Sequence, residues 1–147
     1  MSYVWYFAYG SNMDEKRIKN RGIEVKEWRR GKIRNHKLVF NKPCRYGGCA
    51  NIEPCEGSEV EGVLYLIPYH DLQKLDTYEG YPHHYDRRKI IVDTEEGPIK
   101  AWVYIAARTK PGLKPSKEYM QYLVNGAKQH NLSQKHIQFL ENIEILD

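Results

Sequence analysis

Runs of aromatic and β-branched residues recur along the chain between glycines, prolines and asparagines, a pattern typical of short β-strands joined by turns. The first run, residues 3–9, has no charged side chain and predicts a buried strand. Residues 41–48 and 54–58, which contain proline and glycine, are predicted to be a loop and a turn. The other predicted strands are residues 23–33, 37–41, 49–52, 60–67, 85–94 and 99–107, the last two forming a hairpin.

Apolar residues at three- and four-residue spacing alternate with polar residues in four segments, which predicts amphipathic helices. The predicted helices are residues 13–20, 68–79, 116–130 and 133–143. Ser11 or Asn12 is a suitable N-cap for the first, and Ser116 and Ser133 are suitable N-caps for the last two.

The order of these elements is one strand and helix, then mostly strands, then two terminal helices. Strict alternation of strand and helix is absent, which excludes a doubly wound dinucleotide-binding fold. We therefore expect a mixed α+β fold whose sheet is curved or barrel-like. The 147 residues show no shift in composition and no internal repeat, so one domain over residues 1–147 is expected.

The composition of the chain indicates a globular protein and bears on its location. Hydrophobic residues make up 41% and charged residues 29% of the chain, a balance that favours a packed core over disorder. No apolar run approaches the roughly 20 residues of a membrane-spanning helix, so no membrane association is expected. Residues 1–10 lack the basic and apolar regions of a signal peptide, which makes the cytoplasm the expected location.

Two groups of residues suggest other functions and are set aside. The basic stretch of residues 28–37 resembles a nucleic-acid strip, but the net charge is only +4 and solvated strands often look like this. We expect no nucleic-acid partner. The three cysteines and the histidines lack the paired spacing of a metal site, so no metal is expected and the cysteines are interpreted as structural or incidental. The cysteines are Cys44, Cys49 and Cys55, and the histidines nearest to Glu79 are His70, His83 and His84.

The segment Tyr9-Gly10-Ser11-Asn12 is the first candidate for chemistry. A buried strand that runs through a glycine turn into a helix leaves several backbone N–H groups unpaired. Together with the helix dipole, such groups bind a carboxylate or a developing oxyanion. Taken alone, the tetrapeptide more often marks an ordinary strand-to-helix turn.

Glu79 is the second candidate. It ends the helix predicted for residues 68–79, where the helix dipole is negative, and Gly80 follows as a left-handed cap residue. The neighbouring Tyr78, Tyr81 and Tyr85 are positioned to desolvate the carboxylate. Both effects raise a carboxyl pKa toward the range useful for proton transfer. Taken alone, a solvated glutamate before a capping glycine is the commoner situation.

Both candidates lie in segments that resemble the γ-glutamylcyclotransferase family. The segment Tyr6-Phe7-Ala8-Tyr9-Gly10-Ser11-Asn12 is similar to the opening signature of that family. The segment Leu75-Asp76-Thr77-Tyr78-Glu79-Gly80 resembles the signature that carries its catalytic glutamate. Residues 47–52, Tyr104, residues 115–119 and 126–127, and the final helix follow the pattern in order over nearly the whole chain.

The resemblance implies a small mixed α/β barrel with flanking helices, and an enzyme that cyclises a γ-glutamyl amide to 5-oxoproline. Glu79 would be the general acid/base, and residues 6–12 together with Tyr119 would contact the substrate. One position departs from the pattern, because Cys49 stands where a branched aliphatic residue is expected. A homodimer is possible by the same resemblance, and a monomer is the alternative.

The implied reaction is intramolecular, since the α-amino group of the substrate attacks its own γ-carbonyl, so no cofactor is expected. The motifs do not identify the leaving group, which is an α-amino acid, a simple amine, a γ-glutamylated metabolite or a lysine side chain. A rival hypothesis is a non-catalytic module that binds γ-glutamyl or amino-acid ligands in the same anion pocket. Glu79 distinguishes the two, because a binding module needs no base there.

Overall fold

A computed structural model describes residues 2–146 of the chain. Its five strands form a closed barrel in the order β1-β3-β2-β4-β5, in which β1 also pairs in parallel with β5. The strands are β1 (Tyr3–Ala8), β2 (Glu27–Cys44), β3 (Gly47–Pro68), β4 (Tyr85–Thr94) and β5 (Gly97–Ala106). The helices are η1 (Ser11–Met13), α1 (Glu15–Asn20), α2 (Tyr69–Glu79), α3 (Lys117–Gln129) and α4 (Gln134–Glu141). The mixed α+β fold with a barrel is therefore as predicted.

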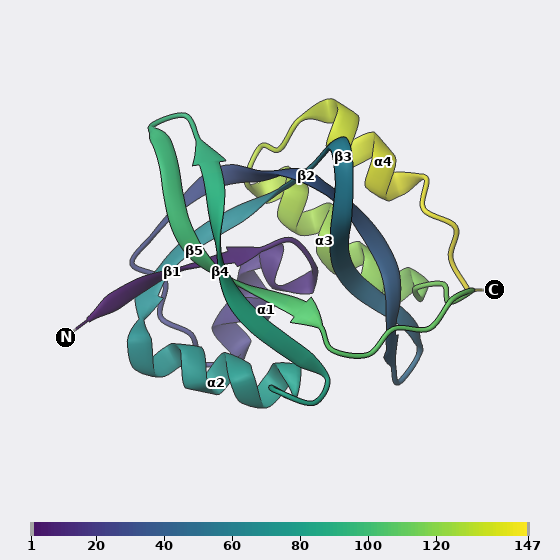
Figure 1. The fold of residues 1–147 in the computed structure, drawn as a ribbon, viewed down its shortest axis with the longest axis horizontal. Helices are drawn as coiled ribbons and strands as arrows, with labels where there is room; N and C mark the ends of the chain where they lie inside the picture. The colour runs from purple at the N-terminus through teal and green to yellow at the C-terminus, as the bar shows by residue number, and fades with distance from the viewer. Residues whose placement is uncertain (1, 147) are drawn as a thin grey trace.

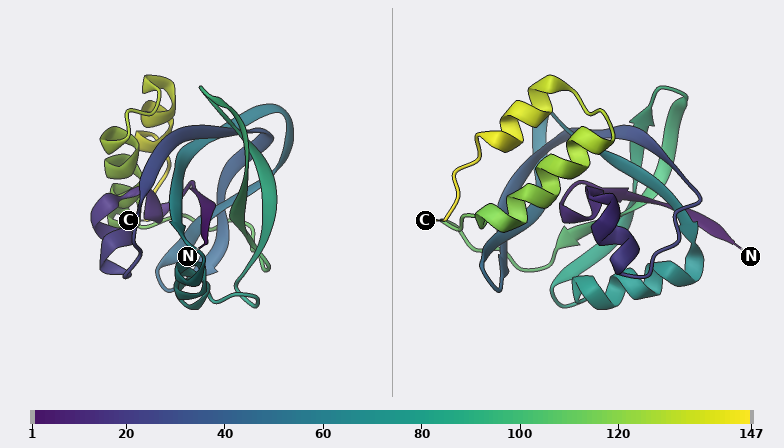
Figure 2. Two further views of the ribbon diagram at one scale, coloured as in Figure 1. Left: turned by 90° about the vertical axis from the view of Figure 1, so that its left-hand side faces the viewer. Right: turned by 180° about the vertical axis from the view of Figure 1, so that it is seen from behind.

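The helices lie outside the barrel. Figure 1 shows α2 along one edge of the barrel, and Figure 2 shows α3 and α4 side by side on another face. The core fills the barrel and the layer beneath the helices, with Phe7, Leu64, Leu75 and Leu123 among its fully buried residues. Within residues 2–146, no helix is long and apolar enough to cross a membrane.

The largest difference from the predicted elements is the long hairpin of β2 and β3. Residues 41–48 and 54–58 were expected to be a loop and a turn, but all of them except the turn residues Arg45 and Tyr46 continue the two strands. The register shifts between Arg34 and His36 and between Val39 and Lys42, and such bulges bend strands without ending them. The prolines and glycines in this region therefore mark bulges and the hairpin end, which the sequence pattern alone does not separate from loops.

A disulfide between Cys44 and Cys49 closes this hairpin, with the two Cα atoms 6.0 Å apart. Cys44 is the last residue of β2 and Cys49 is close to the start of β3, so the pair flanks the turn at Arg45 and Tyr46. The spacing of the cysteines in the sequence does not predict this disulfide, because their proximity depends on the hairpin register. Cys55 is free.

The first helix also differs from its prediction. Residues 13–20 do not form one helix, because the 3₁₀ turn η1 ends at Met13 and α1 begins at Glu15. Asp14 caps α1 by accepting a hydrogen bond from the Arg17 backbone N–H. Neither Ser11 nor Asn12 is the cap, which leaves the Asn12 side chain free for another contact.

The remaining elements agree with the prediction to within a few residues. Gly80 ends α2 in the left-handed conformation with φ of 66°, which favours glycine. Ser116 and Ser133 accept the capping hydrogen bonds of α3 and α4. The β4–β5 hairpin follows α2 directly and closes the barrel against β1.

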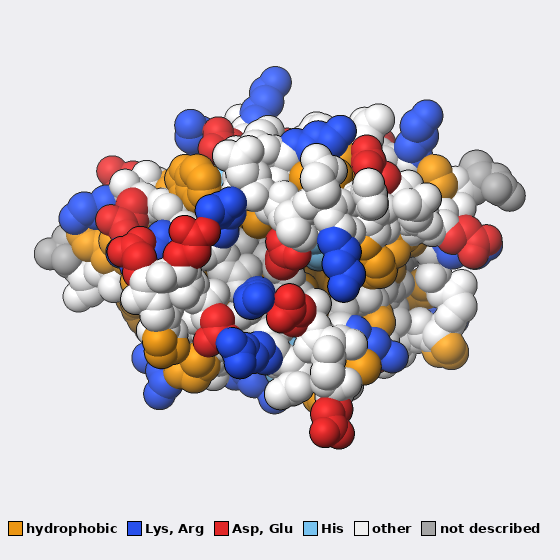
Figure 3. Space-filling view, turned by 90° about the horizontal axis from the view of Figure 1, so that it is seen from above, with side chains coloured by type: hydrophobic (Ala, Val, Ile, Leu, Met, Phe, Trp, Pro, Cys, Tyr) orange, Lys and Arg blue, Asp and Glu red, His pale blue; other side chains and the backbone are white. Residues whose placement is uncertain are grey.

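The basic stretch of residues 28–37 lies on β2 and is largely neutralised. Arg30 contacts Glu95, Lys32 contacts Glu59 at 3.4 Å, and Arg34 contacts Asp93 at 2.6 Å. Figure 3 shows positive and negative side chains intermixed on the face that includes the tip of the β4–β5 hairpin and α4. The stretch therefore presents no continuous positive surface on that face.

Candidate active site

The site begins at the end of α2, where Glu79 is the last helical residue. Its side chain is 17% exposed and points toward the bend that follows β1. Oε1 of Glu79 accepts a hydrogen bond from Nδ2 of Asn12 at 3.2 Å. Two segments that are 67 residues apart in the chain thus meet through this carboxylate.

Arg21 is the second group at this carboxylate. Its Nη1 lies 3.4 Å from Oε1 of Glu79 and donates to Oδ1 of Asn12 at 2.9 Å. The guanidinium carbon also lies 4.8 Å from the centre of the Tyr78 ring. Asn12 is almost fully buried, so its amide holds Glu79 and Arg21 in a fixed relation.

Burial raises the pKa of Glu79 above the usual value of a glutamate. The positive charges of Arg21, Arg17 and Lys42 and the Asn12 hydrogen bond act in the opposite direction. The upward shift was expected, but the cause is only partly the one inferred from the sequence. Tyr78 is 55% exposed and Tyr81 is 38% exposed, so neither shields the carboxylate, whereas the buried Tyr85 lines its pocket.

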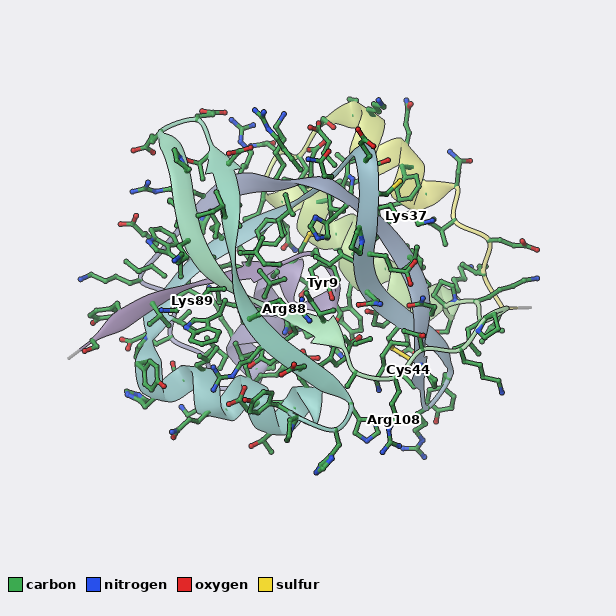
Figure 4. The ribbon with its side chains drawn as sticks, viewed as in Figure 1. Tyr9, Lys37, Cys44, Arg88, Lys89 and Arg108 are labelled. Carbon is green, nitrogen blue, oxygen red and sulfur yellow. A yellow bond between two sulfur atoms is a disulfide. The ribbon has the colours of Figure 1, made fainter. Side chains whose placement is uncertain are left out.

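A group of buried tyrosines surrounds a narrow pocket of about 40 Å³ beside Glu79. Tyr6 accepts a hydrogen bond from Asn12 Nδ2 at 3.0 Å, and Tyr9 donates to the Tyr104 carbonyl at 2.6 Å. Figure 4 shows Tyr9 in the interior of the barrel, close to the end of β5. Since the Tyr9 proton is used by the Tyr104 carbonyl, Tyr9 shapes the pocket rather than supplying a free donor.

Tyr119 enters the same pocket from the first turn of α3. Its hydroxyl oxygen accepts a hydrogen bond from the Ala50 N–H at 3.0 Å. The neighbouring Tyr85 hydroxyl donates to the Ala50 carbonyl at 2.7 Å, so both polar groups of Ala50 are held by tyrosines. Burial raises the pKa of Tyr119 to about 12, so the hydroxyl keeps its proton at neutral pH and has it available for a ligand.

The bend at Gly10, Ser11 and Asn12 lines the pocket opposite these tyrosines. Within residues 2–146, the backbone N–H groups of these three residues donate no hydrogen bond to another protein group. A Cβ on Gly10 would lie 3.3 Å from the Tyr119 hydroxyl, so glycine permits the close approach of α3. The expected dipole of a full helix is missing, because η1 has only three residues.

The structure brings together all but one of the residues singled out from the sequence. The inner pocket is lined by Tyr6, Phe7, Tyr9, Gly10, Ser11, Asn12, Glu79 and Tyr119. Ala8 is the exception, because it is buried in β1 opposite Val63 and does not line the pocket.

A wider cleft of about 600 Å³ continues outward from this pocket. The two share Ser11, Glu79, Tyr85 and Tyr119 as lining residues, so Glu79 lies at their boundary. Within residues 2–146, no group of three or more histidine, cysteine, aspartate or glutamate residues is placed to hold a metal ion. The arrangement therefore offers a half-buried carboxylate, a row of unpaired amides and a tyrosine hydroxyl around one narrow space.

Comparison with known proteins identifies the family of this chain. A family model described as "Gamma-glutamyl cyclotransferase, AIG2-like" matches residues 6–124. The chain belongs to this family. The gamma-glutamylcyclotransferases of Bos taurus and Homo sapiens are each 30% identical to it, over 146 and 147 residues, which is 95% of this chain and 78% of each relative. A solved structure titled gamma-glutamyl cyclotransferase has a TM-score of 0.89 and 29% identity, and the match covers 99% of this chain and 90% of that one.

In this member of the gamma-glutamyl cyclotransferase family, three pocket neighbours were not found from the sequence. Arg21 was interpreted only as the end of a helix, and Ala50 and Tyr104 were noted only as parts of family segments. No signal for Ala50 was available, because its role depends on backbone groups alone.

Proposed function

We propose that this chain is a γ-glutamylcyclotransferase, a lyase that converts a γ-glutamyl amide to 5-oxoproline and releases the amine. The observation that carries the proposal is the half-buried Glu79 carboxylate, which faces the unpaired amides after β1 across one narrow pocket. The substrate supplies its own nucleophile. The residues of the pocket therefore need only hold the glutamyl unit in a bent conformation, with its α-amino group close to its γ-carbonyl, and transfer protons.

Proton transfer is the task proposed for Glu79. The α-ammonium of the substrate is not nucleophilic until it loses a proton, and an ionised Glu79 accepts that proton. The free amine then attacks the γ-carbonyl, and Glu79 returns the proton to the leaving nitrogen as its C–N bond breaks. The ring nitrogen gives its second proton to the released amine, which leaves as an ammonium. A raised pKa suits the first step, because it makes the ionised carboxylate a stronger base.

The polar groups around the pocket are proposed to hold the charged oxygens of the glutamyl unit. The N–H groups of Gly10, Ser11 and Asn12 are proposed to bind one such oxygen, either the α-carboxylate or the oxyanion of the intermediate. The Tyr119 hydroxyl donates to the same unit from α3, and Tyr6 and Phe7 close the pocket floor. All these groups are fixed by packing before the substrate binds.

The direct test is release of 5-oxoproline from a γ-glutamyl dipeptide by the purified chain. We expect stoichiometric formation of 5-oxoproline and a free amino acid, detected by mass spectrometry. Binding of the dipeptide without turnover would support the non-catalytic module instead. Failure to bind or to cleave any member of a panel of γ-glutamyl amino acids, peptides and amines would remove the proposal.

The Arg21→Met substitution tests how the charge of Glu79 is controlled. Arg21 is the strongest of the groups that lower the pKa of Glu79, so its removal lets burial raise that pKa further. Since the base must be ionised, the acidic limb of the profile of kcat/KM against pH is expected to move to higher pH.

Arg88→Met is the matched control for Arg21→Met, because Arg88 is an exposed residue of β4 (Figure 4). We expect it to leave the acidic limb in place. An acidic limb that is unmoved in Arg21→Met, or moved to lower pH, would contradict the electrostatic role of Arg21.

The Tyr119→Phe substitution tests the proposed hydroxyl donor. We expect kcat/KM to fall by about tenfold, since one neutral hydrogen bond contributes about 0.5–1.5 kcal/mol. The substitution also leaves the Ala50 N–H without its acceptor, so a modest loss of thermal stability is expected. Tyr122→Phe on the same helix is the control. If kcat and KM of Tyr119→Phe both match the wild type, Tyr119 belongs to the scaffold.

A further inference from the structure

The outer cleft is strongly basic, and this feature is not needed to cyclise the glutamyl unit. Its lining includes four cationic side chains, namely Arg17 of α1, Arg21 just after α1, Lys42 of β2 and Arg45 at the hairpin turn. Among the lining residues, Glu79 is the one carboxylate, and it lies at the boundary with the inner pocket. Whatever part of a substrate extends past Glu79 enters this basic space.

Two of these cations already have partners. Nε of Arg17 donates to Oγ of Ser11 at 3.0 Å, and its guanidinium lies over the Tyr122 ring at 4.3 Å. Arg21 is held by Asn12, Glu79 and the Tyr78 ring. These two side chains therefore support the site from its wall. The charge of Arg21 is paired with Glu79, whereas the partners of Arg17 are neutral.

Lys42 differs from Arg17 and Arg21, because it is a buried residue. It occupies the core-facing side of β2, where the alternating neighbours Leu38 and Phe40 are buried apolar residues, and it is itself only 7% exposed. Its Nζ contacts Nδ1 of His84 at 3.2 Å and lies 5.4 Å from the centre of the Tyr85 ring. Among residues 2–146, no carboxylate lies within salt-bridge distance of Lys42.

Burial at this position has an electrostatic cost. Desolvation lowers the pKa of Lys42, and the negative charge of Glu79 only partly opposes that effect. An anion bound beside Nζ would stabilise the ammonium, so the site gains more from an anionic ligand than an exposed lysine would. A hydrogen-bonded lysine at a core-facing strand position is thus prepared for a negatively charged group in the cleft.

The surrounding backbone holds Lys42 in place. Lys42 pairs with Cys49 across the β2–β3 hairpin, and Cys49 forms the disulfide with Cys44 two residues further along β2. Figure 4 shows Cys44 at the end of the hairpin arm, away from the core of the barrel. The disulfide restrains the backbone at Lys42 before a ligand binds, so less conformational entropy is lost on binding.

We propose that Lys42 is a specificity-determining residue that binds an anionic group on the leaving side of the substrate. The proposal rests on the proposed cyclotransferase function, and it selects among the leaving groups left open by the sequence. The cleaved amide lies beside Glu79, so the leaving amine projects into the outer cleft and its carboxylate meets Lys42. Amino acids and peptides with a nearby free carboxylate fit this cleft, whereas uncharged or cationic amines leave Lys42 unpaired.

The test compares two substrates that differ only in this charge, γ-glutamyl-L-alanine and γ-glutamyl-L-alaninamide. For the wild type we expect kcat/KM to be roughly tenfold to a hundredfold higher for the carboxylate form, as a charged hydrogen bond would give. In Lys42→Met this ratio is expected to fall to near one, and in Lys42→Arg part of it is expected to remain. Lys37→Met, an exposed lysine of the same strand (Figure 4), is the matched control and should keep the wild-type ratio.

Each outcome separates this inference from the proposed function. Equal kcat/KM for the two substrates in the wild type would overturn the role of Lys42 and leave the cyclotransferase in place, without needing any variant to fold. An equal loss on both substrates in Lys42→Met would also overturn it, because Lys42 would then bind the glutamyl unit. If the wild type forms 5-oxoproline from neither substrate, the role of Lys42 is overturned, and if it also cleaves no member of the panel of γ-glutamyl compounds, the cyclotransferase proposal fails as well.

Discussion

Glu79→Gln is expected to lower kcat/KM for 5-oxoproline release by about 10²–10⁴-fold, the usual contribution of one general acid/base. Glutamine has nearly the same shape, and its side-chain oxygen still accepts the hydrogen bonds that Asn12 and Arg21 donate to Glu79. It cannot accept a proton from the α-ammonium. The loss is therefore expected in kcat more than in KM, and the variant should still bind the uncleaved dipeptide in calorimetry.

The stability of the same variant supplies an independent measurement. Because burial raises the folded-state pKa of Glu79, the fold prefers the protonated carboxyl, and the ionised form reduces stability as the pH rises through that pKa. Removing the charge should leave the thermal unfolding midpoint near neutral pH at or above the wild-type value. Glu56→Gln, an exposed residue of β3, is the control for both measurements. Retention of most turnover in Glu79→Gln would exclude Glu79 as the base.

The sequence located the two halves of the candidate site but not the contact between them. Short motifs identified Glu79 and the bend after the first strand, because each lies beside a glycine at the end of a helix or strand and within a recognisable family motif. Asn12 was interpreted as one of two alternative helix caps and as a substrate contact. It is not a cap, and it bridges Tyr6, Glu79 and Arg21. Such a bridge depends on how α2 packs beside η1, and local residue preferences do not encode that packing.

In the fold as well, features set by neighbouring residues were predicted, whereas features set by contacts between distant segments were not. The caps at Ser116 and Ser133 and the left-handed Gly80 were predicted correctly, because each depends on a few neighbouring residues. The hairpin of β2 and β3 was divided into short pieces, because Pro43 and Pro54 resemble chain breaks. In the barrel, Pro43 lies near the hairpin end and Pro54 beside a bulge, where the missing N–H is tolerated.

Gly126→Ala is expected to give the largest loss of stability among the substitutions considered, with a loss of activity that follows from it. Gly126 lies inside α3, where alanine would normally favour the helix by about 1 kcal/mol. A Cβ there would lie 2.6 Å from the Met13 carbonyl oxygen, and closer still to the carbonyl carbon, both in the backbone of η1. Neither atom can turn away as a flexible side chain would, so α3 and η1 must separate.

We expect this separation to destabilise the fold by about 2 kcal/mol net, as overpacked cores do, and to lower the unfolding midpoint by about 4–8 °C. It should also lower kcat/KM, because α3 carries Tyr119 and η1 follows the Gly10 bend that Tyr119 approaches. Asn125→Ala tests the same change one residue earlier on the exposed face, where it should raise stability slightly. An unfolding midpoint of Gly126→Ala at or above the wild-type value would mean that the contact between α3 and η1 is loose. The proposed placement of Tyr119 by that contact would then fail.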